Sequence, residues 1–426
     1  MQPVINLDRD WSPPDESDGR RRRRTPRWAA LVMVAVTALV CTASAPSTPT
    51  LTRLFTVPVH VHATTAFRDG RLYVAETTRR QTVELHAYRL PDGDPQWSVT
   101  LPGTDGAWIV TTVPGVIVVN TQDLVSGGAP QVSAVDARTG RLLWRRDAHA
   151  LTVASAGRVL VLDDLAANHE LTMTSVDART GAGVWSTTFP NGSRWALRTP
   201  TDDGRLGILT PDGALSVVST RTGARLATLA TRVEPAAMAE AQVLEVRGRL
   251  LVGYRGPIGT TVLASYDPAT LSRNWQVVFP AGHAPYLSAA SDCDPYLCVL
   301  DDGAMTALDP ATGASVWAAR GWNWAEAYHG WVLAGAAAPS KNHWGLLDPR
   351  TGTQVLDLTG WDVSGDDILT RPGDPAWVAR LDPTAPRLRP LAPLPGGWSP
   401  GCTGEGTYLA CVVGPVLNVF RDNSIR

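Results

Sequence analysis

The sequence reads AVDARTGRLLW from Ala134 to Trp144 and SVDARTGAGVW from Ser175 to Trp185. Both stretches place an aspartate, a Thr-Gly pair and a tryptophan at the same offsets, and they start 41 residues apart. Self-similarity at a period of 20 to 50 residues is the mark of a repeat architecture. The repeat therefore decides the fold before any other feature of the chain.

The aspartate position recurs along most of the chain. Equivalent positions are Arg89, Asp136, Asp177, Ser219, Asp267, Asp309, Asp348 and Asp382, at intervals of 34 to 48 residues. A tryptophan follows eight residues later in five copies, at Trp97, Trp144, Trp185, Trp275 and Trp317. Between the copies, short β-branched runs alternate with Asp-Gly and Asn-Gly pairs, which supply the positive φ of tight hairpin turns. A module of four strands in about 42 residues is the size of a propeller blade.

Each part of the repeat has a physical role in such a blade. The aspartate and threonine side chains can bond the backbone of the turn, and glycine adopts the left-handed conformation that other residues resist. We expect the next strand to deliver tryptophan to the boundary with the neighbouring blade, where its ring buries on the order of 200 Å². The residues to which we assign these structural roles are Asp136, Thr139, Gly140, Trp144, Asp177, Thr180, Gly181, Trp185, Asp267, Trp275, Asp309, Thr312, Gly313, Trp317, Asp348, Thr351 and Gly352.

The pattern Ala-x-Asp-x-x-Thr-Gly-x-x-x-Trp resembles the repeat of the pyrroloquinoline-quinone-type (PQQ-like) β-propellers. AVDARTGRLLW and ALDPATGASVW match it fully, SVDARTGAGVW and SYDPATLSRNW nearly so, and LLDPRTGTQVL keeps the turn but lacks the tryptophan. The copies headed by Ser219 and Asp382 are degenerate. The resemblance covers roughly residues 60 to 421 and implies an all-β propeller over residues 51–426.

The number of blades is open between seven and nine. Apolar strand pairs can be counted at nine places, some of them irregular, but eight is usual in the family, and the 376 residues from Leu51 divide into eight blades of about 47. We therefore expect eight. The last module ends at its third strand, and residues 52–57, TRLFTV, supply the missing outer strand, so that the two chain ends close one blade and leave no free sheet edge.

The propeller is preceded by a predicted membrane anchor. Residues 28–45, WAALVMVAVTALVCTASA, carry no charge and follow an arginine cluster at 20–24. Eighteen residues span about 27 Å as a helix, close to the roughly 30 Å hydrocarbon core, and the arginines keep the preceding end in the cytoplasm. We expect a disordered cytoplasmic tail over residues 1–27, a transmembrane helix over 28–45, a linker over 46–50 and an extracytoplasmic propeller.

A cleaved signal peptide is the alternative to this anchor. Ala43-Ser44-Ala45 fits the small-x-small pattern, although Pro46 disfavours cleavage after Ala45; cleavage after Ala43 stays open. Lipid attachment at Cys41 is disfavoured, because no small residue stands directly before that cysteine.

Four cysteines form two close pairs. Cys293 and Cys298 flank one turn, and Cys402 and Cys411 flank another, so we predict two local disulfides on the oxidising side of the membrane. Zinc binding is the weaker reading, because neither pair has the two-residue spacing of a zinc knuckle and no histidine lies beside them.

The sequence offers little for catalysis. Quinone-dependent enzymes of this family carry adjacent cysteines and a calcium or lanthanide ion held by Glu, Asn and Asp; no Cys-Cys pair occurs here, and the matching repeat residues are structural in the family. His60 and His62 lack a third metal ligand, and the Asp-Asp pairs at 163–164, 202–203, 301–302 and 366–367 suit hairpin turns better than calcium. Trp322, Trp324 and Trp331 could line a ligand site, but packing is favoured. We expect no catalytic residue, metal or cofactor.

The overall prediction is a membrane-anchored, extracytoplasmic propeller that serves as a non-catalytic binding or scaffold protein of the cell envelope. Its expected partners are the membrane and envelope proteins or peptides. With 38 basic and 40 acidic residues, no global field draws the chain to nucleic acid. A sensor with a ligand-binding propeller and a quinoprotein dehydrogenase are the alternatives.

Overall fold

The computed structural model describes residues 50–425 except 61–62, 79–81, 102–105, 123–129, 155–156, 164–169, 197–203, 232, 234–236, 238–240, 281–285, 302–303, 337–342, 365–366 and 395–400. The predicted tail and membrane helix, and the linker up to residue 49, lie outside these residues. Among the residues described, no helix is both long enough and apolar enough to cross a membrane. Residues Thr50–Arg426 form one compact unit.

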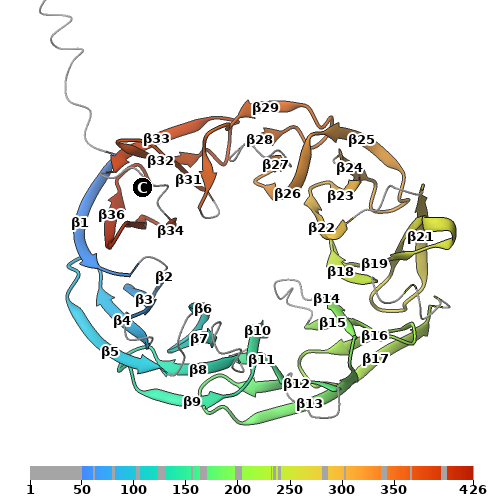
Figure 1. Cartoon of the computed structure of the whole chain (residues 1–426), viewed down its shortest axis with the longest axis horizontal. Helices are drawn as coiled ribbons and strands as arrows, with labels where there is room; N and C mark the ends of the chain where they lie inside the picture. Colours follow the sequence, from blue (N-terminus) through green and yellow to red (C-terminus); the bar gives the residue numbers. More distant parts are fainter. Residues whose placement is uncertain are drawn as a thin grey trace, which may run out of the picture. The chain divides into compact units, whose positions relative to one another are not determined.

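The described residues of this unit form nine four-stranded antiparallel sheets, which follow one another around a central opening (Figure 1). The first four blades are β2 (Thr64–Arg68), β3 (Arg71–Thr77), β4 (Val83–Arg89), β5 (Pro95–Leu101); β6 (Gly106–Val113), β7 (Val116–Gln122), β8 (Gln131–Asp136), β9 (Leu142–Arg146); β10 (His149–Ala154), β11 (Arg158–Asp163), β12 (Glu170–Asp177), β13 (Gly183–Pro190); and β14 (Arg194–Ala196), β15 (Arg205–Leu209), β16 (Ala214–Ser219), β17 (Arg225–Ala230). In each blade the first strand lies nearest the opening and the fourth lies on the outer edge.

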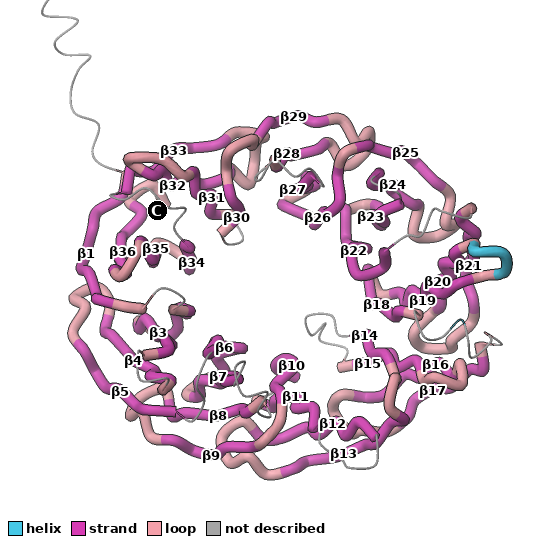
Figure 2. Tube along the Cα trace, in the orientation of Figure 1, coloured by secondary structure: helices cyan, strands magenta, loops and turns pink. Residues whose placement is uncertain are grey.

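The next four blades repeat this arrangement. They are β18 (Gln242–Val246), β19 (Arg249–Arg255), β20 (Thr261–Tyr266), β21 (Arg273–Phe279); β22 (Tyr286–Cys293), β23 (Tyr296–Asp301), β24 (Ala304–Leu308), β25 (Ser315–Arg320); β26 (Trp322–Tyr328), β27 (Trp331–Ala336), β28 (Trp344–Leu347), β29 (Gln354–Asp357); and β30 (Asp362–Val363), β31 (Ile368–Arg371), β32 (Ala376–Leu381), β33 (Leu388–Leu394). A short 3-10 turn, η1 (Pro257–Gly259), protrudes from the rim between β19 and β20 (Figure 2).

The ninth blade joins the two ends of the propeller. It consists of β34 (Gly401–Glu405), β35 (Tyr408–Val413) and β36 (Val416–Asp422), with β1 (Leu51–Pro58) as its outer strand. Leu51 pairs with Asp422 and Val57 with Leu417. The closing strand predicted at 52–57 is thus confirmed.

The prediction of eight blades is wrong. The usual blade number of the family outweighed the nine strand pairs visible in the sequence, although the 376 residues from Leu51 give nine blades of about 42 residues, close to the repeat interval. Blade number depends on the angle that the boundary side chains set between neighbouring sheets, and this angle cannot be read from the repeat itself.

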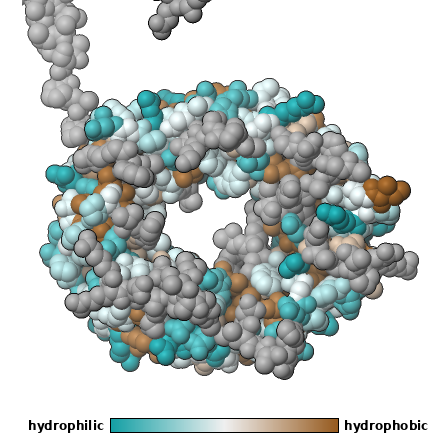
Figure 3. All heavy atoms as spheres, viewed as in Figure 1, coloured by the Kyte–Doolittle hydropathy of each residue, from teal (hydrophilic) through white to brown (hydrophobic). Residues whose placement is uncertain are grey.

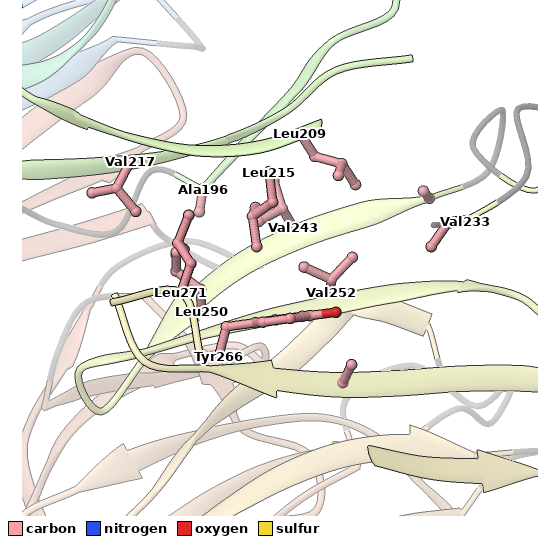
Figure 4. Close-up of a cluster of buried hydrophobic side chains, with 12 residues drawn as sticks. Ala196, Leu209, Leu215, Val217, Val233, Val243, Leu250, Val252, Tyr266 and Leu271 are labelled. Carbon is pink, nitrogen blue, oxygen red and sulfur yellow. The ribbon is translucent and has the colours of Figure 1, made fainter. Parts of the chain in front are cut away.

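Burial explains the strand composition. The second and third strands of a blade are covered on both faces by the neighbouring sheets, so β7 and β20 are buried along almost their whole length. The outer strands alternate between exposed and partly buried residues, as in β13 and β17. Figure 4 shows the cluster between the fourth and fifth blades, where Leu215 of one sheet faces Val243 and Val252 of the next.

Candidate functional site

The repeated turns are built as the sequence predicts for their side chains. In the third blade, Asp177 Oδ1 accepts hydrogen bonds from Thr180 N at 2.8 Å, Thr180 Oγ1 at 2.9 Å and Arg179 N at 3.0 Å. Gly181 follows with a φ of +69°. Asp136, Asp267 and Asp309 accept the same three bonds from their own turns. At Asp348 the bond from Arg350 N remains, while the Thr351 hydroxyl lies against Thr353.

Each predicted indole lies against the turn of the next blade. The Trp144 Nε1 donates to the carbonyl of Ala178 at 2.8 Å, and a Cβ placed on Gly181 would lie 2.6 Å from the Trp144 ring. The same pairs of contacts join Trp97 to Ala137 and Gly140, Trp185 to Thr220 and Gly223, Trp275 to Pro310 and Gly313, and Trp317 to Pro349 and Gly352. The turn glycine is therefore needed twice, for its positive φ and for the room it leaves to the ring.

A β-bulge aims each indole at this contact. In the third blade Trp185 pairs with Ser175 and Gly183 with Val176, which leaves Val184 as the extra residue. The fourth strands of the other blades with an indole carry the same irregularity one residue before the ring. Because a bulge turns the following side chain out of the regular alternation, it directs the ring into the blade boundary.

Phe55 is the boundary side chain that sequence reasoning missed. It lies in β1, directly after a register shift between Arg53 and Phe55, and its ring occupies the space that a Cβ on Gly93 would need. Phe55 thus stands where the other blades have tryptophan, at the boundary between the ninth and first blades. Its strand is separated from the rest of its blade by more than 340 residues, so no local motif marks it.

The turn carboxylates are committed to their own backbone. The hydrogen bonds from the Thr180 backbone and hydroxyl hold the pKa of Asp177 below its ordinary value, and those from the Thr270 and Ala269 backbone do so for Asp267. Within the described ranges, no three His, Cys, Asp or Glu side chains are placed to hold a metal ion. The hydrogen bonds of these carboxylates support the turns to which they belong.

The aromatic stretch at 321–331 packs inside the propeller. Trp322 is buried and its ring stacks on His343 at 5.2 Å, while Trp324 meets Trp344 edge-on at 5.1 Å. Trp331 packs beside the apolar cluster that contains Leu333. These contacts agree with packing rather than a ligand site.

The structure describes only some of the remaining candidate groups. His60 donates from its backbone N–H to Glu76 at 2.6 Å, and His62 lies outside the described residues. Of the four Asp-Asp pairs, at least one residue of each lies outside them as well. Burial raises the pKa of Asp163, and Asp367 forms an ion pair with Arg380 at 3.1 Å.

Both predicted disulfides are present. Cys293 bonds to Cys298, and Cys402 bonds to Cys411 across the directly paired strands β34 and β35. All four cysteines are buried. The zinc alternative is therefore excluded for these residues.

A pocket of about 320 Å³ lies at the seam between the ninth and first blades. Its walls come from the β2–β3 turn with Arg68, Asp69 and Arg71, and from the β34–β35 turn with Glu405 and Tyr408. Phe67 stacks on Tyr408 with ring centroids 6.3 Å apart. The pocket thus combines guanidinium, carboxylate and aromatic groups, which suit binding of a partly charged ligand.

The central opening is the other concave feature of the propeller. Figure 3 shows that the opening remains when all heavy atoms are drawn. It is lined by the first strands of the blades, and together with the seam pocket it offers surfaces for binding.

The chain is similar to one family model and to several solved structures. The PQQ_2 family model, described as outer membrane protein assembly factor BamB, matches residues 38–194 and 169–321. Among solved structures, BamB from Moraxella catarrhalis is 17% identical with a TM-score of 0.47, covering 88% of this chain and 98% of that one. The computationally designed Ika8 protein is 16% identical with a TM-score of 0.48, covering 75% and 98%.

Sqt1 from Saccharomyces cerevisiae is 11% identical with a TM-score of 0.50, covering 87% of this chain and 98% of that one. At that identity the likeness shows the fold alone. No curated protein matches the chain. The family model spans more than half of the sequence, and the structure is a propeller built on the matching repeat; the chain belongs to the PQQ-like β-propeller family whose model is described as outer membrane protein assembly factor BamB.

Proposed function

We propose that the chain is a membrane-anchored, extracytoplasmic propeller that binds envelope proteins or peptides and catalyses no reaction. The uncharged stretch 28–45 behind its arginine cluster supports the anchor. The two disulfides support an oxidising compartment. The description of the family model, an outer membrane protein assembly factor, supports a role among envelope proteins.

The observation that carries the binding role is the seam pocket. Arg71 and Glu405 offer charges of both signs, and the stacked rings of Phe67 and Tyr408 offer an apolar surface. A peptide segment with polar and apolar side chains finds complementary groups there. The pocket is formed by the first and ninth blades, which come from opposite ends of the propeller sequence. The site therefore exists only when the propeller is closed.

The absence of catalysis is supported by how the polar groups are used. The repeated aspartates bond their own turns, and the matching repeat residues hold the blades together. A direct check is to add pyrroloquinoline quinone and calcium to the purified chain with an artificial electron acceptor. We expect no oxidation of alcohols or sugars; turnover would contradict the proposal.

Site-specific photo-crosslinking in intact cells tests the binding role. A photoreactive amino acid replaces Glu405 at the pocket, and a control variant carries it at Thr188, an exposed position on the outer strand β13. We expect an exported or outer membrane protein to be captured at position 405 and not at 188. Equal capture at both positions, or capture of cytoplasmic proteins alone, would count against the proposal.

Protease accessibility tests the location separately. When protease is added to the outer side of the cytoplasmic membrane, we expect the propeller to be cut and a tag fused to residue 1 to stay intact until the membrane is permeabilised. A tag that is digested while the propeller is protected would reverse the topology.

A further inference from the structure

One face of the propeller carries exposed arginines on three consecutive blades. The Arg-Thr-Gly turns headed by Asp136, Asp177 and Ser219 place Arg138, Arg179 and Arg221 at the same position of the second, third and fourth blades. Arg141 and Arg225 follow in two of these turns, and all five side chains are exposed. We call Arg138, Arg141, Arg179, Arg221 and Arg225 the arginine arc. The outer strands β9, β13 and β17 that follow these turns lie next to one another along the rim (Figure 1).

Few carboxylates balance the arc. Asp136 and Asp177 are held by the N–H groups of their own turns, and Arg179 approaches Asp136 only to 3.9 Å. In the described part of the chain, no carboxylate pairs with Arg138, Arg141, Arg221 or Arg225. The corresponding turns of the fifth and sixth blades carry Pro-Ala, and that of the seventh blade carries Pro349-Arg350 with an exposed arginine. Three consecutive blades with an arginine at this position therefore occur only from the second to the fourth among the described turns.

The chain enters the propeller on this same face. In the blades with an uninterrupted repeat, the arginine turns connect the third strand to the fourth. In the ninth blade β36 is the third strand and β1 the fourth, and Leu51 at the start of β1 pairs with Asp422 at the end of β36. The Asn423 N–H also donates to the Thr50 carbonyl at 2.9 Å. Thr50 therefore lies on the face that bears the arc.

The distance to the bilayer is short if the predicted helix is an anchor. Residues 46–50 separate that helix from β1, and five residues span at most about 18 Å when fully extended. A tether of this length, attached to the arginine-bearing face, keeps that face within reach of the membrane. This step rests on the proposed function.

We propose that the arginine arc binds the headgroups of anionic phospholipids in the membrane that anchors the chain. Guanidinium groups bind phosphate oxygens through paired hydrogen bonds, and basic side chains near an anionic leaflet are attracted within about one Debye length, roughly 10 Å. The arc and the tether together hold the propeller in one orientation. The opposite face then remains accessible to protein partners. The seam pocket is formed by the β2–β3 and β34–β35 turns, which lie on the face of the arc, so a protein segment bound there lies at the membrane surface.

The test uses the full chain in lipid nanodiscs made of phosphatidylcholine alone or of phosphatidylcholine with phosphatidylglycerol. Hydrogen exchange is followed in the turns Asp136–Arg141 and Ser219–Arg225 and, on the opposite face, in the turn Thr210–Gly213. We expect the arc turns to exchange roughly tenfold more slowly with phosphatidylglycerol, the effect to fade at high salt, and the opposite turn to be unchanged. Equal exchange in both lipids would overturn the proposal.

Charge variants assign the effect to the arc. R138Q/R141Q/R221Q/R225Q removes four positive charges from this face, and R320E/R371E lowers the net charge by the same amount at exposed arginines whose strands end on the opposite face. We expect the first variant to abolish the lipid-dependent protection and the second to keep it. Loss in both variants would reduce the effect to net charge and refute a specific arc.

Two further outcomes separate the inference from the proposed function. If the chain does not enter the nanodiscs, the anchor is refuted. Flotation with phosphatidylglycerol vesicles then still tests the arc. We expect the chain to bind these vesicles, and the four-glutamine variant to bind them at least about tenfold more weakly. If soluble polyglutamate protects the arc and anionic lipid does not, the arc binds acidic protein, and the lipid proposal fails.

Discussion

Ala227 and Leu271 pack into one apolar cluster at the boundary between the fourth and fifth blades. They occupy the two positions that hold a tryptophan and a glycine at five other boundaries in the described part of the ring. Leu271 adopts a φ of +56°, the left-handed conformation that glycine has in the other turns. A larger turn residue thus accompanies a smaller strand residue, so the boundary stays filled at the cost of a strained backbone.

This exchange predicts strong coupling between the two positions. Ala227→Trp alone should destabilise the chain by about 1–3 kcal/mol, because the indole has no room beside Leu271. Adding Leu271→Gly restores the arrangement of the other boundaries and should recover most of that loss. Thermal unfolding of the two single variants and the double variant measures the coupling. Strictly additive effects would show that the two side chains do not compete for the same space.

The turn glycines predict a second, matched comparison. In Gly223→Ala the new methyl group would lie 2.8 Å from the Trp185 ring, at a φ of +71°. Gly157→Ala meets a similar φ of +76° but open space, so it carries the backbone strain alone, about 1–2 kcal/mol. We expect Gly223→Ala to lower the unfolding temperature clearly more than Gly157→Ala. Equal losses would mean that the Trp185 side chain moves aside without a cost in stability.

The contact of Phe55 predicts where the propeller opens first. Phe55→Ala removes the partly buried side chain that fills the boundary between the ninth and first blades, and we expect a loss of about 1–3 kcal/mol, less than for a fully buried ring. Since β1 is held by one neighbouring strand, β36, we expect amides of Leu51–Pro58 to exchange much faster while the third blade is unaffected. Thr56→Ala, an exposed change in the same strand, is the control. Unchanged exchange of β1 in Phe55→Ala would remove Phe55 from its assigned role.

The sequence predicts the parts of this fold whose chemistry is local. Asp177, Thr180 and Gly181 form their turn within five residues, and Trp185 follows at a fixed distance, so a repeat of a few residues is enough to identify them. The closing strand at 52–57 was also predictable, because a blade with three strands leaves an edge to be covered.

What the sequence does not reveal depends on distant contacts. Phe55 and Gly93 are recognisable as a boundary pair only after the ring is closed, and the bulge before each indole leaves no separate mark in the sequence. The seam pocket joins Arg68 to Glu405 from opposite ends of the propeller, so no motif announces it. The prediction of eight blades missed the ninth because it followed the usual blade number of the family, although nine strand pairs can be counted in the sequence.

The hydrogen-bonded aspartates predict a stability contribution that depends on pH. The bonds from the Thr180 backbone and hydroxyl lower the pKa of Asp177 in the folded chain below its ordinary 3.8. A group with a lowered pKa stabilises the fold fully above its unfolded pKa, and this contribution disappears as the pH falls through the folded pKa. In Asp177→Asn we therefore expect a lower unfolding temperature than in the natural chain at pH 7, with a gap that stays constant down to about pH 5 and narrows below pH 4. Thr180→Ala removes one of three donors and should show a smaller gap of the same shape, because the two backbone bonds remain. Unfolding temperatures measured at steps from pH 7 to pH 3 test this, and a gap that is independent of pH would show that the charge of Asp177 contributes nothing to the turn.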